Sequence, residues 1–181
     1  MARFWTNCLL ALGFGLSGNA WAAHAYAQFG DIRYPAGFSH FSYVNPAAPK
    51  GGEIVLVPPT RQSNFDKYNP FTLKGSAPPS MLAMMFDTLL VGNMDEPTTA
   101  YGLLASDIQV APDGLSVTFQ IHPRARFHNG DPVLARDVKH SFDTLNGPLV
   151  SPSYRSALED VAGVDVLDER TVRYRFKKPN R

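Results

Sequence analysis

The spacing of apolar residues changes from a period of two to a period near 3.6 within residues 115–145. Apolar and polar residues alternate over 115–121, as on a β-strand with one buried face. Apolar residues then recur at nearly helical spacing over 135–145. Between the two lies Asn129-Gly130, and glycine supplies the positive φ that a tight turn needs. The chain must therefore pass from a strand, through a turn, into a helix that packs across the sheet.

The same alternation predicts two antiparallel hairpins. The first covers 108–121 and turns at Pro112-Asp113-Gly114, and the second covers 164–176 and turns at Asp168-Glu169. Two hairpins and at least one packed helix place the chain in the α+β class.

Shorter patterns predict the remaining elements. A run of β-branched and apolar residues predicts a buried strand over 53–57. A helix is predicted over 81–90, capped by Ser80, and its core face would consist of Leu82, Met85, Phe86 and Leu89. Residues 91–102 are predicted to form a connecting loop. Residues 26–50 show no sustained period, which predicts an extended surface segment with Phe38, Phe41 and Tyr43 tucked in.

Residues 1–25 have the layout of a secretory signal peptide. Arg3 is followed by a short apolar run and then by two A-x-A sequences, Ala20-Trp21-Ala22 and Ala23-His24-Ala25. We expect cleavage after Ala22 or after Ala25, because the apolar run is too short for a membrane anchor. Cys8, the one cysteine of the chain, lies in this segment. An exported chain without a thiol is typical of the bacterial periplasm, which is the predicted location.

Charge and motifs exclude several functions. The formal net charge is +1, so a basic surface for nucleic acid is not predicted. No nucleophile elbow, zinc-protease motif, phosphate-binding loop or dinucleotide fingerprint occurs in the sequence, and we expect no enzyme activity and no cofactor. His122, His128 and His140 lack the spacing of metal ligands. Asp95-Glu96 lies in a proline-bounded loop and is expected to face solvent.

Several separated motifs resemble one family. The segment PDGLSVTFQIHPRARFHNGDPVLARDVKHSF is similar to a pattern of the family 5 extracellular solute-binding proteins of ABC importers, which include oligopeptide, dipeptide and nickel binders. The segments YPAGFSHFSYVNPAAPKGGEI, FDKYNPFTLKG and DEPTTAYGLLA resemble the branch of the periplasmic oligopeptide and microcin C binder. Leu134 departs from the pattern, which usually has a hydroxyl residue there. We expect this to cost about 1 kcal/mol, the usual value of a helix cap.

The resemblance implies a fold and a function. Residues 26–181 would be the N-terminal part of a family 5 domain, an incomplete first lobe of a type II periplasmic-binding-protein-like fold. The protein would bind oligopeptides or peptide-like compounds and deliver them to an ABC permease in the inner membrane. Two alternatives stay open: a truncated gene product that does not bind ligand alone, and a secreted hydrolase, which would need a nucleophile motif.

The resemblance also implies ligand-binding residues. In the family, the loop after the first strand approaches the ligand, and a position in the segment SPSYRSAL often carries an aromatic residue near it. Phe65 and Phe71 could equally be ordinary core residues, and Tyr154 a surface tyrosine. The predicted binding residues are Asn64, Phe65, Tyr68, Asn69, Phe71 and Tyr154.

Overall fold

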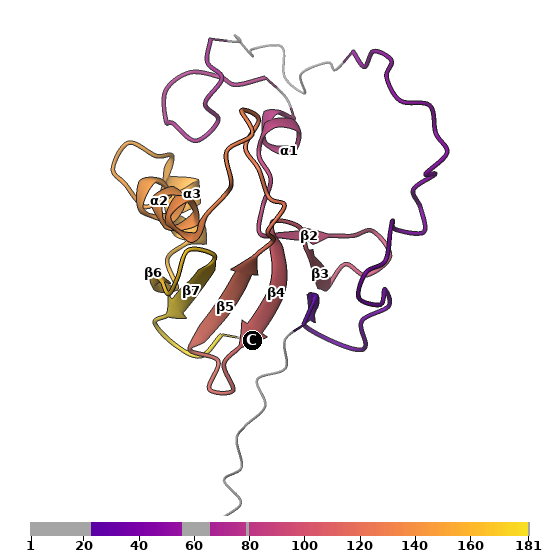
Figure 1. Cartoon of the computed structure of the whole chain (residues 1–181). Helices are drawn as coiled ribbons and strands as arrows, with labels where there is room; N and C mark the ends of the chain where they lie inside the picture. Colours follow the sequence, from indigo (N-terminus) through magenta and orange to yellow (C-terminus); the bar gives the residue numbers. More distant parts are fainter. Residues whose placement is uncertain (1–22, 56–65, 79, 181) are drawn as a thin grey trace, which may run out of the picture.

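Two antiparallel sheets organise the computed structural model, which describes residues 23–55, 66–78 and 80–180. The smaller sheet has the strand order β1-β3-β2, with β1 Ala25–Ala27, β2 Leu90–Gly92 and β3 Thr99–Gly102. The larger sheet has the order β4-β5-β7-β6, with β4 Ala105–Val110, β5 Ser116–Ile121, β6 Val161–Val166 and β7 Thr171–Phe176. The smaller sheet lies beside β4 at the edge of the larger one (Figure 1).

Both predicted hairpins are confirmed. Strand β4 pairs with β5, and β6 with β7, through the predicted turns. The β5–β7 pairing joins the hairpins into one sheet, with Phe119 opposite Val172. The side chains of Ile108, Phe119, Val164 and Val172 are buried on one face. The alternation therefore identified the buried face of each strand correctly.

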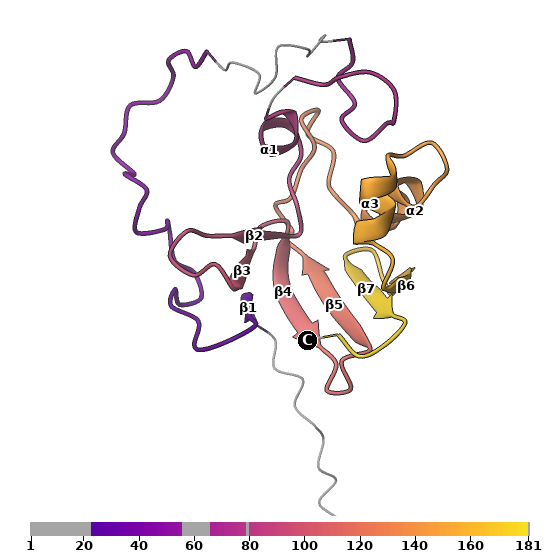
Figure 2. The same ribbon diagram turned by 180° about the vertical axis from the view of Figure 1, so that it is seen from behind.

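The helix predicted over 135–145 is confirmed as α2 Ala135–Leu145. Gly130 has φ 91°, so the turn before the helix has the backbone that its glycine predicted. Helix α2 packs on β6 and β7 and buries Ala135 and Phe142 in the main core. A short helix that the sequence did not predict, α3 Pro152–Ala157, lies beside α2 (Figures 1 and 2).

The predicted helix over 81–90 is mostly wrong. Helix α1 spans only Met81–Met85, and Ser80 has φ 63° and makes no capping hydrogen bond through its side chain. Its predicted core residues Leu82, Met85 and Phe86 are exposed. A helix this short needs tertiary packing, and the described residues do not cover this apolar face. The backbone after Phe86 is extended instead, and the Leu89 carbonyl accepts hydrogen bonds from Leu103 and Ala105.

Two further sequence-based expectations fail. Ile54 and Val55 are 76% and 80% exposed and lie in no strand, so this part of the strand predicted over 53–57 is wrong; residues 56–57 lie outside the described ranges. Residues 91–102, predicted as a loop, contain the end of β2 and the whole of β3. In both cases pairing partners decide whether an apolar run becomes a strand, and these partners are distant in sequence.

Candidate functional site

Residues 66–76 form a closed loop, called here the Phe71 loop. Asp66 and Ser76 close it: the Asp66 amide donates to the Ser76 carbonyl over 3.2 Å, and the Ser76 amide donates to the Asp66 carboxylate over 2.6 Å. Inside the loop, Lys67 Nζ donates to the carbonyl oxygen of Thr72 over 2.6 Å. These bonds give the loop a fixed shape without regular secondary structure.

The Phe71 loop is attached to the start of α3. The Ser151 amide donates to the Phe71 carbonyl over 2.9 Å, and Thr72 forms an antiparallel bridge with Val150. The ring of Phe71 packs edge-on between Phe86 and Tyr154, at centroid distances of 5.0 Å and 5.2 Å. The structure therefore brings together two predicted site residues, Phe71 and Tyr154, from segments far apart in the sequence. The three rings are called here the Phe71 cluster.

The other predicted site residues fall into two groups. Asn69 lies in the Phe71 loop, where its side-chain oxygen accepts a hydrogen bond from the Phe71 amide over 2.9 Å, so it shapes the turn. Tyr68 is 71% exposed on the same loop. Asn64 and Phe65 lie outside the described residues.

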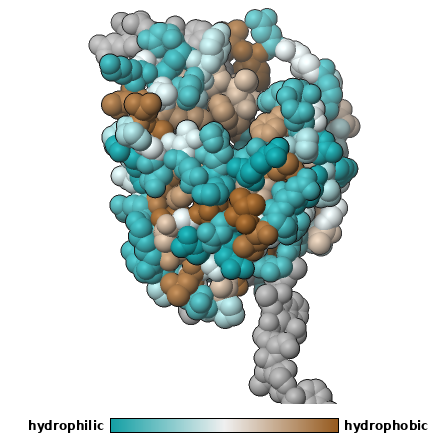
Figure 3. Space-filling view, turned by 60° about the vertical axis from the view of Figure 1, so that its left-hand side comes forward, coloured by the Kyte–Doolittle hydropathy of each residue, from teal (hydrophilic) through white to brown (hydrophobic). Residues whose placement is uncertain are grey.

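A large apolar groove opens beside the Phe71 cluster and shares Phe86 with it. Its volume is about 860 Å³. Its floor consists of core residues of the larger sheet and α2, including Phe119, Phe142 and Tyr174. Burial raises the pKa of Tyr174 to about 12, so this side chain is neutral at physiological pH. Apolar residues also reach the surface in patches among hydrophilic ones on the face shown in Figure 3.

The groove has little of the polar equipment of a ligand site. A binding site ordinarily combines apolar walls with a few polar groups that converge on the ligand. Here the charged residues include Asp137, whose carboxylate caps the Leu134 amide over 2.8 Å, and Arg126, whose guanidinium donates to the Pro123 and Ala125 carbonyls. Both are engaged in local structure. We therefore interpret the groove as uncovered core.

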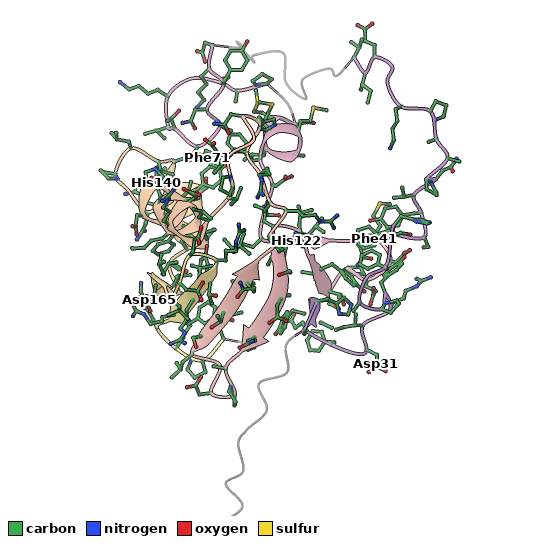
Figure 4. The ribbon with its side chains drawn as sticks, viewed as in Figure 1. Asp31, Phe41, Phe71, His122, His140 and Asp165 are labelled. Carbon is green, nitrogen blue, oxygen red and sulfur yellow. The ribbon has the colours of Figure 1, made fainter. Side chains whose placement is uncertain are left out.

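A second aromatic cluster anchors the N-terminal segment. The rings of Tyr34, Phe38, Phe41 and Tyr101 contact one another at centroid distances of 5.1–5.7 Å. Phe41 lies on the side of the molecule opposite Phe71 (Figure 4). Phe38 and Phe41 are half-buried, as the sequence predicted, whereas Tyr43 is 44% exposed and stacks on Phe41.

Two acidic residues bind this second cluster, which corrects the expectation that they face solvent. The Asp95 carboxylate accepts hydrogen bonds from the Tyr34 and Ser42 hydroxyls, and these bonds lower its pKa. Burial raises the pKa of Glu96, but the hydrogen bonds, led by that from the Tyr101 hydroxyl over 2.6 Å, outweigh it and lower the pKa overall. The sequence signal was present only as tyrosines and acids in separate segments.

Other functional classes find no support in the described part of the chain. No group of three or more metal-binding side chains is found among residues 23–55, 66–78 and 80–180. His122 and His140 lie on different elements, as Figure 4 shows. Within the same ranges, no helix is both long and apolar enough to span a membrane.

Residues 99–181 match the family described as bacterial extracellular solute-binding proteins, family 5. The family predicted from the motifs is thereby confirmed, and the chain is related to these solute-binding proteins. Among curated relatives, "Uncharacterized protein YejA" of Escherichia coli is 38% identical over 159 residues, which cover 88% of this chain and 25% of that protein.

Two further relatives come from Agrobacterium fabrum. "Peptidoglycan-binding protein YepA" is 35% identical over 87% of this chain and 26% of its own length. "Probable peptide-binding protein YejA" is 33% identical over 83% of this chain and 24% of its own length. The chain thus spans about a quarter of the length of the curated relatives it matches.

The fold is also that of solved binding proteins. NikA from Brucella suis, solved with Fe(III)-EDTA, matches with a TM-score of 0.55 and 26% identity over 65% of this chain and 23% of its own. The predicted class, an α+β part of a periplasmic-binding-protein fold, is confirmed, and the matched segment is again only part of that fold.

Proposed function

We propose that this chain forms the N-terminal part of a periplasmic solute-binding protein that delivers oligopeptides or peptide-like compounds to an ABC permease. The names of two relatives, peptide-binding and peptidoglycan-binding, support this ligand class. The observation that carries the proposal is the Phe71 cluster, where Phe71 and Tyr154 meet beside an exposed Tyr68. Aromatic side chains offer contact area to varied peptide side chains with little rotamer entropy to lose.

The proposed binding wall consists of the loop residues 64–71 and Tyr154. Phe71 and Tyr154 would contact apolar parts of the peptide, while Tyr68 and Asn69 would offer polar groups to its backbone. Binding by such a wall involves no bond chemistry, and the sequence carries no motif for it. Export by the leader 1–25 would bring the wall to the periplasm, where the permease partner is reached.

One wall leaves most of a bound peptide in water. Binding proteins of this class enclose the ligand by closing two lobes around it. We therefore expect the isolated chain to bind peptides no better than about millimolar, whereas a full-length context gives micromolar affinity, a difference of about 4 kcal/mol.

A chimera tests the proposal. Residues 23–181 replace the matching quarter of the Agrobacterium fabrum YejA relative, and calorimetry measures peptide-pool binding by the chimera and by the isolated chain. In the chimera, Phe71→Ala and Tyr154→Ala should each weaken binding about tenfold, the effect of losing one aromatic contact of about 1.4 kcal/mol. Tyr43→Ala, an aromatic residue of the other cluster, is the matched control and should not change affinity.

The outcomes separate the parts of the proposal. A folded chimera that binds no peptide would contradict the ligand class. Micromolar binding that survives both wall substitutions would contradict the wall but keep the function. Micromolar binding by the isolated monomer would show that one lobe suffices. Thermal melting of every variant distinguishes lost binding from lost folding.

A further inference from the structure

The backbone of residues 23–24 belongs to the folded sheets. The Ala23 amide donates to the Ile108 carbonyl over 3.1 Å, and the Ile108 amide donates back to the Ala23 carbonyl over 2.8 Å. The Gly102 amide donates to the His24 carbonyl over 2.9 Å. These residues therefore extend β1 and tie it to the neighbouring strands β3 and β4.

The side chains of the same segment are also engaged. Ala25 is 2% exposed and lies opposite Tyr101 in the sheet, and His24 Nε2 lies 2.8 Å from the Tyr34 carbonyl. Gly102 permits this close approach, because a Cβ there would lie 2.3 Å from the Ala105 carbonyl oxygen. Ala23, His24 and Ala25 thus contribute to the N-terminal core as well as to the sheet.

We propose that the exported chain is cleaved between Ala22 and Ala23, so that the mature protein begins Ala23-His24-Ala25. This inference rests on the proposed export. Both A-x-A sequences provide the small residues that signal peptidase requires, so the leader alone does not distinguish them. Cleavage after Ala25 would remove three backbone hydrogen bonds to Ile108 and Gly102 and the contact to Tyr34.

The new N-terminus at Ala23 is compatible with the fold. Cleavage converts the Ala23 amide nitrogen into an ammonium group, which still carries donors for the Ile108 carbonyl. Loss of residues 23–25 would instead leave backbone groups of Ile108 and Gly102 without these partners, and unpaired polar groups in a buried site are destabilising. A mature chain starting at Tyr26 would therefore lose much of the attachment of β1.

The test expresses the full chain in a bacterium that exports it and determines the first residue of the periplasmic protein by intact mass and N-terminal sequencing. The expected first residue is Ala23. A first residue of Tyr26, or any other position, overturns the proposed bond while leaving export intact. Recovery of only the full-length mass overturns both the bond and the export.

Two matched variants identify the bond that is cut. Ala22→Asp puts a charge at the last leader position of the first site only, and it should abolish the product that begins at Ala23. Ala25→Val blocks only the second site and should leave that product unchanged. Pulse labelling reads processing before any misfolded product is degraded. The reverse pattern, with Ala25→Val blocking processing and Ala22→Asp not, would refute the proposal.

Discussion

Leu134 precedes α2 at the position where a hydroxyl or carboxylate side chain ordinarily caps a helix. Its side chain is 6% exposed, and the helix start is satisfied in other ways. The Asp137 carboxylate accepts from the Leu134 amide, and the Glu169 carbonyl accepts from the Ala135 amide over 2.9 Å. Burial of an apolar side chain therefore replaces the cap that the family pattern has at this residue.

A pair of substitutions separates these contributions. Leu134→Ala should lower the free energy of unfolding by about 2–3 kcal/mol, because a buried side chain is truncated. Leu134→Ser loses the same burial but gains a capping oxygen, so it should be about 1 kcal/mol less destabilising than Leu134→Ala. Urea unfolding of both variants measures the difference. Equal stability of the two would mean that the backbone at α2 cannot accept a side-chain cap.

The bond from Tyr34 to Asp95 makes stability depend on pH. Hydrogen bonds from Tyr34 and Ser42 lower the pKa of Asp95 below its ordinary value of 3.8. The charged form is therefore favoured by folding, and its stabilisation is present above that value and is lost as the pH falls through the lower pKa of the folded state.

Asp95→Asn should consequently lower the urea midpoint at neutral pH, and the gap from the wild type should narrow below about pH 4, where the wild-type carboxylate becomes protonated. Tyrosine fluorescence during urea titrations from pH 3 to pH 7 provides the measurement. Asp31→Asn, at an exposed residue of the same segment, is the control. A gap that stays constant across the range would contradict a role for the Asp95 charge.

At the scale of elements, hairpins and α2 formed as predicted, whereas α1 and the strand over 53–57 did not. The successful elements are paired or packed within a short stretch of chain. Strand β4 follows directly into β5, and α2 follows the same hairpin before β6 and β7 cover it. Local alternation is a sufficient signal there, because the buried face and its partner are encoded together.

The Phe142→Ala substitution tests the assigned face of α2. Phe142 is 7% exposed and packs at 6.2 Å from the ring of Tyr174. Its removal should destabilise the protein by about 3 kcal/mol, near the lower end for phenylalanine because the groove beside it lets neighbours and water relax. His140→Ala, on the exposed face of α2, should change stability by less than about 0.5 kcal/mol. A small effect of Phe142→Ala would place the buried face elsewhere.

At the scale of the whole molecule, an apolar groove leads from the exposed face of α1 to the core. Met85 and Phe86 line it and are 51% and 43% exposed. Apolar patches of this kind favour association in water. The described chain therefore carries more uncovered apolar surface at this groove than a stable monomer ordinarily shows.

We expect the chain to associate in a concentration-dependent way, which sedimentation velocity measures. Met85→Glu should reduce association, because a charge in the groove must be desolvated when two chains meet. Met94→Glu is the matched control, since Met94 is 79% exposed but does not line the groove. A monodisperse wild-type monomer at all concentrations, or equal effects of the two variants, would contradict an associating groove.

Much of the candidate site could be anticipated only in part. The resemblance suggested both Phe71 and Tyr154, yet their contact depends on the bridge from Thr72 to Val150, which no local pattern encodes. Asn69 was predicted as a ligand group and proves to shape the turn. Asp95 and Glu96 were misassigned because their tyrosine partners lie up to 62 residues away in the sequence, as in the bond from Tyr34 to Glu96's neighbour Asp95 at a separation of 61.

The sequence alone determined the two hairpins, the turn at Gly130, helix α2 and the family, because each is written in local periodicity or contiguous motifs. Tertiary structure decided the β5–β7 pairing, the small sheet, the Phe71 cluster and the lock between Asp95 and Tyr34. These features need partners brought together by the whole fold. Short apolar runs such as 53–55 and 81–86 show the same physics from the other side, since a favourable pattern stays exposed where nothing in the described chain covers it.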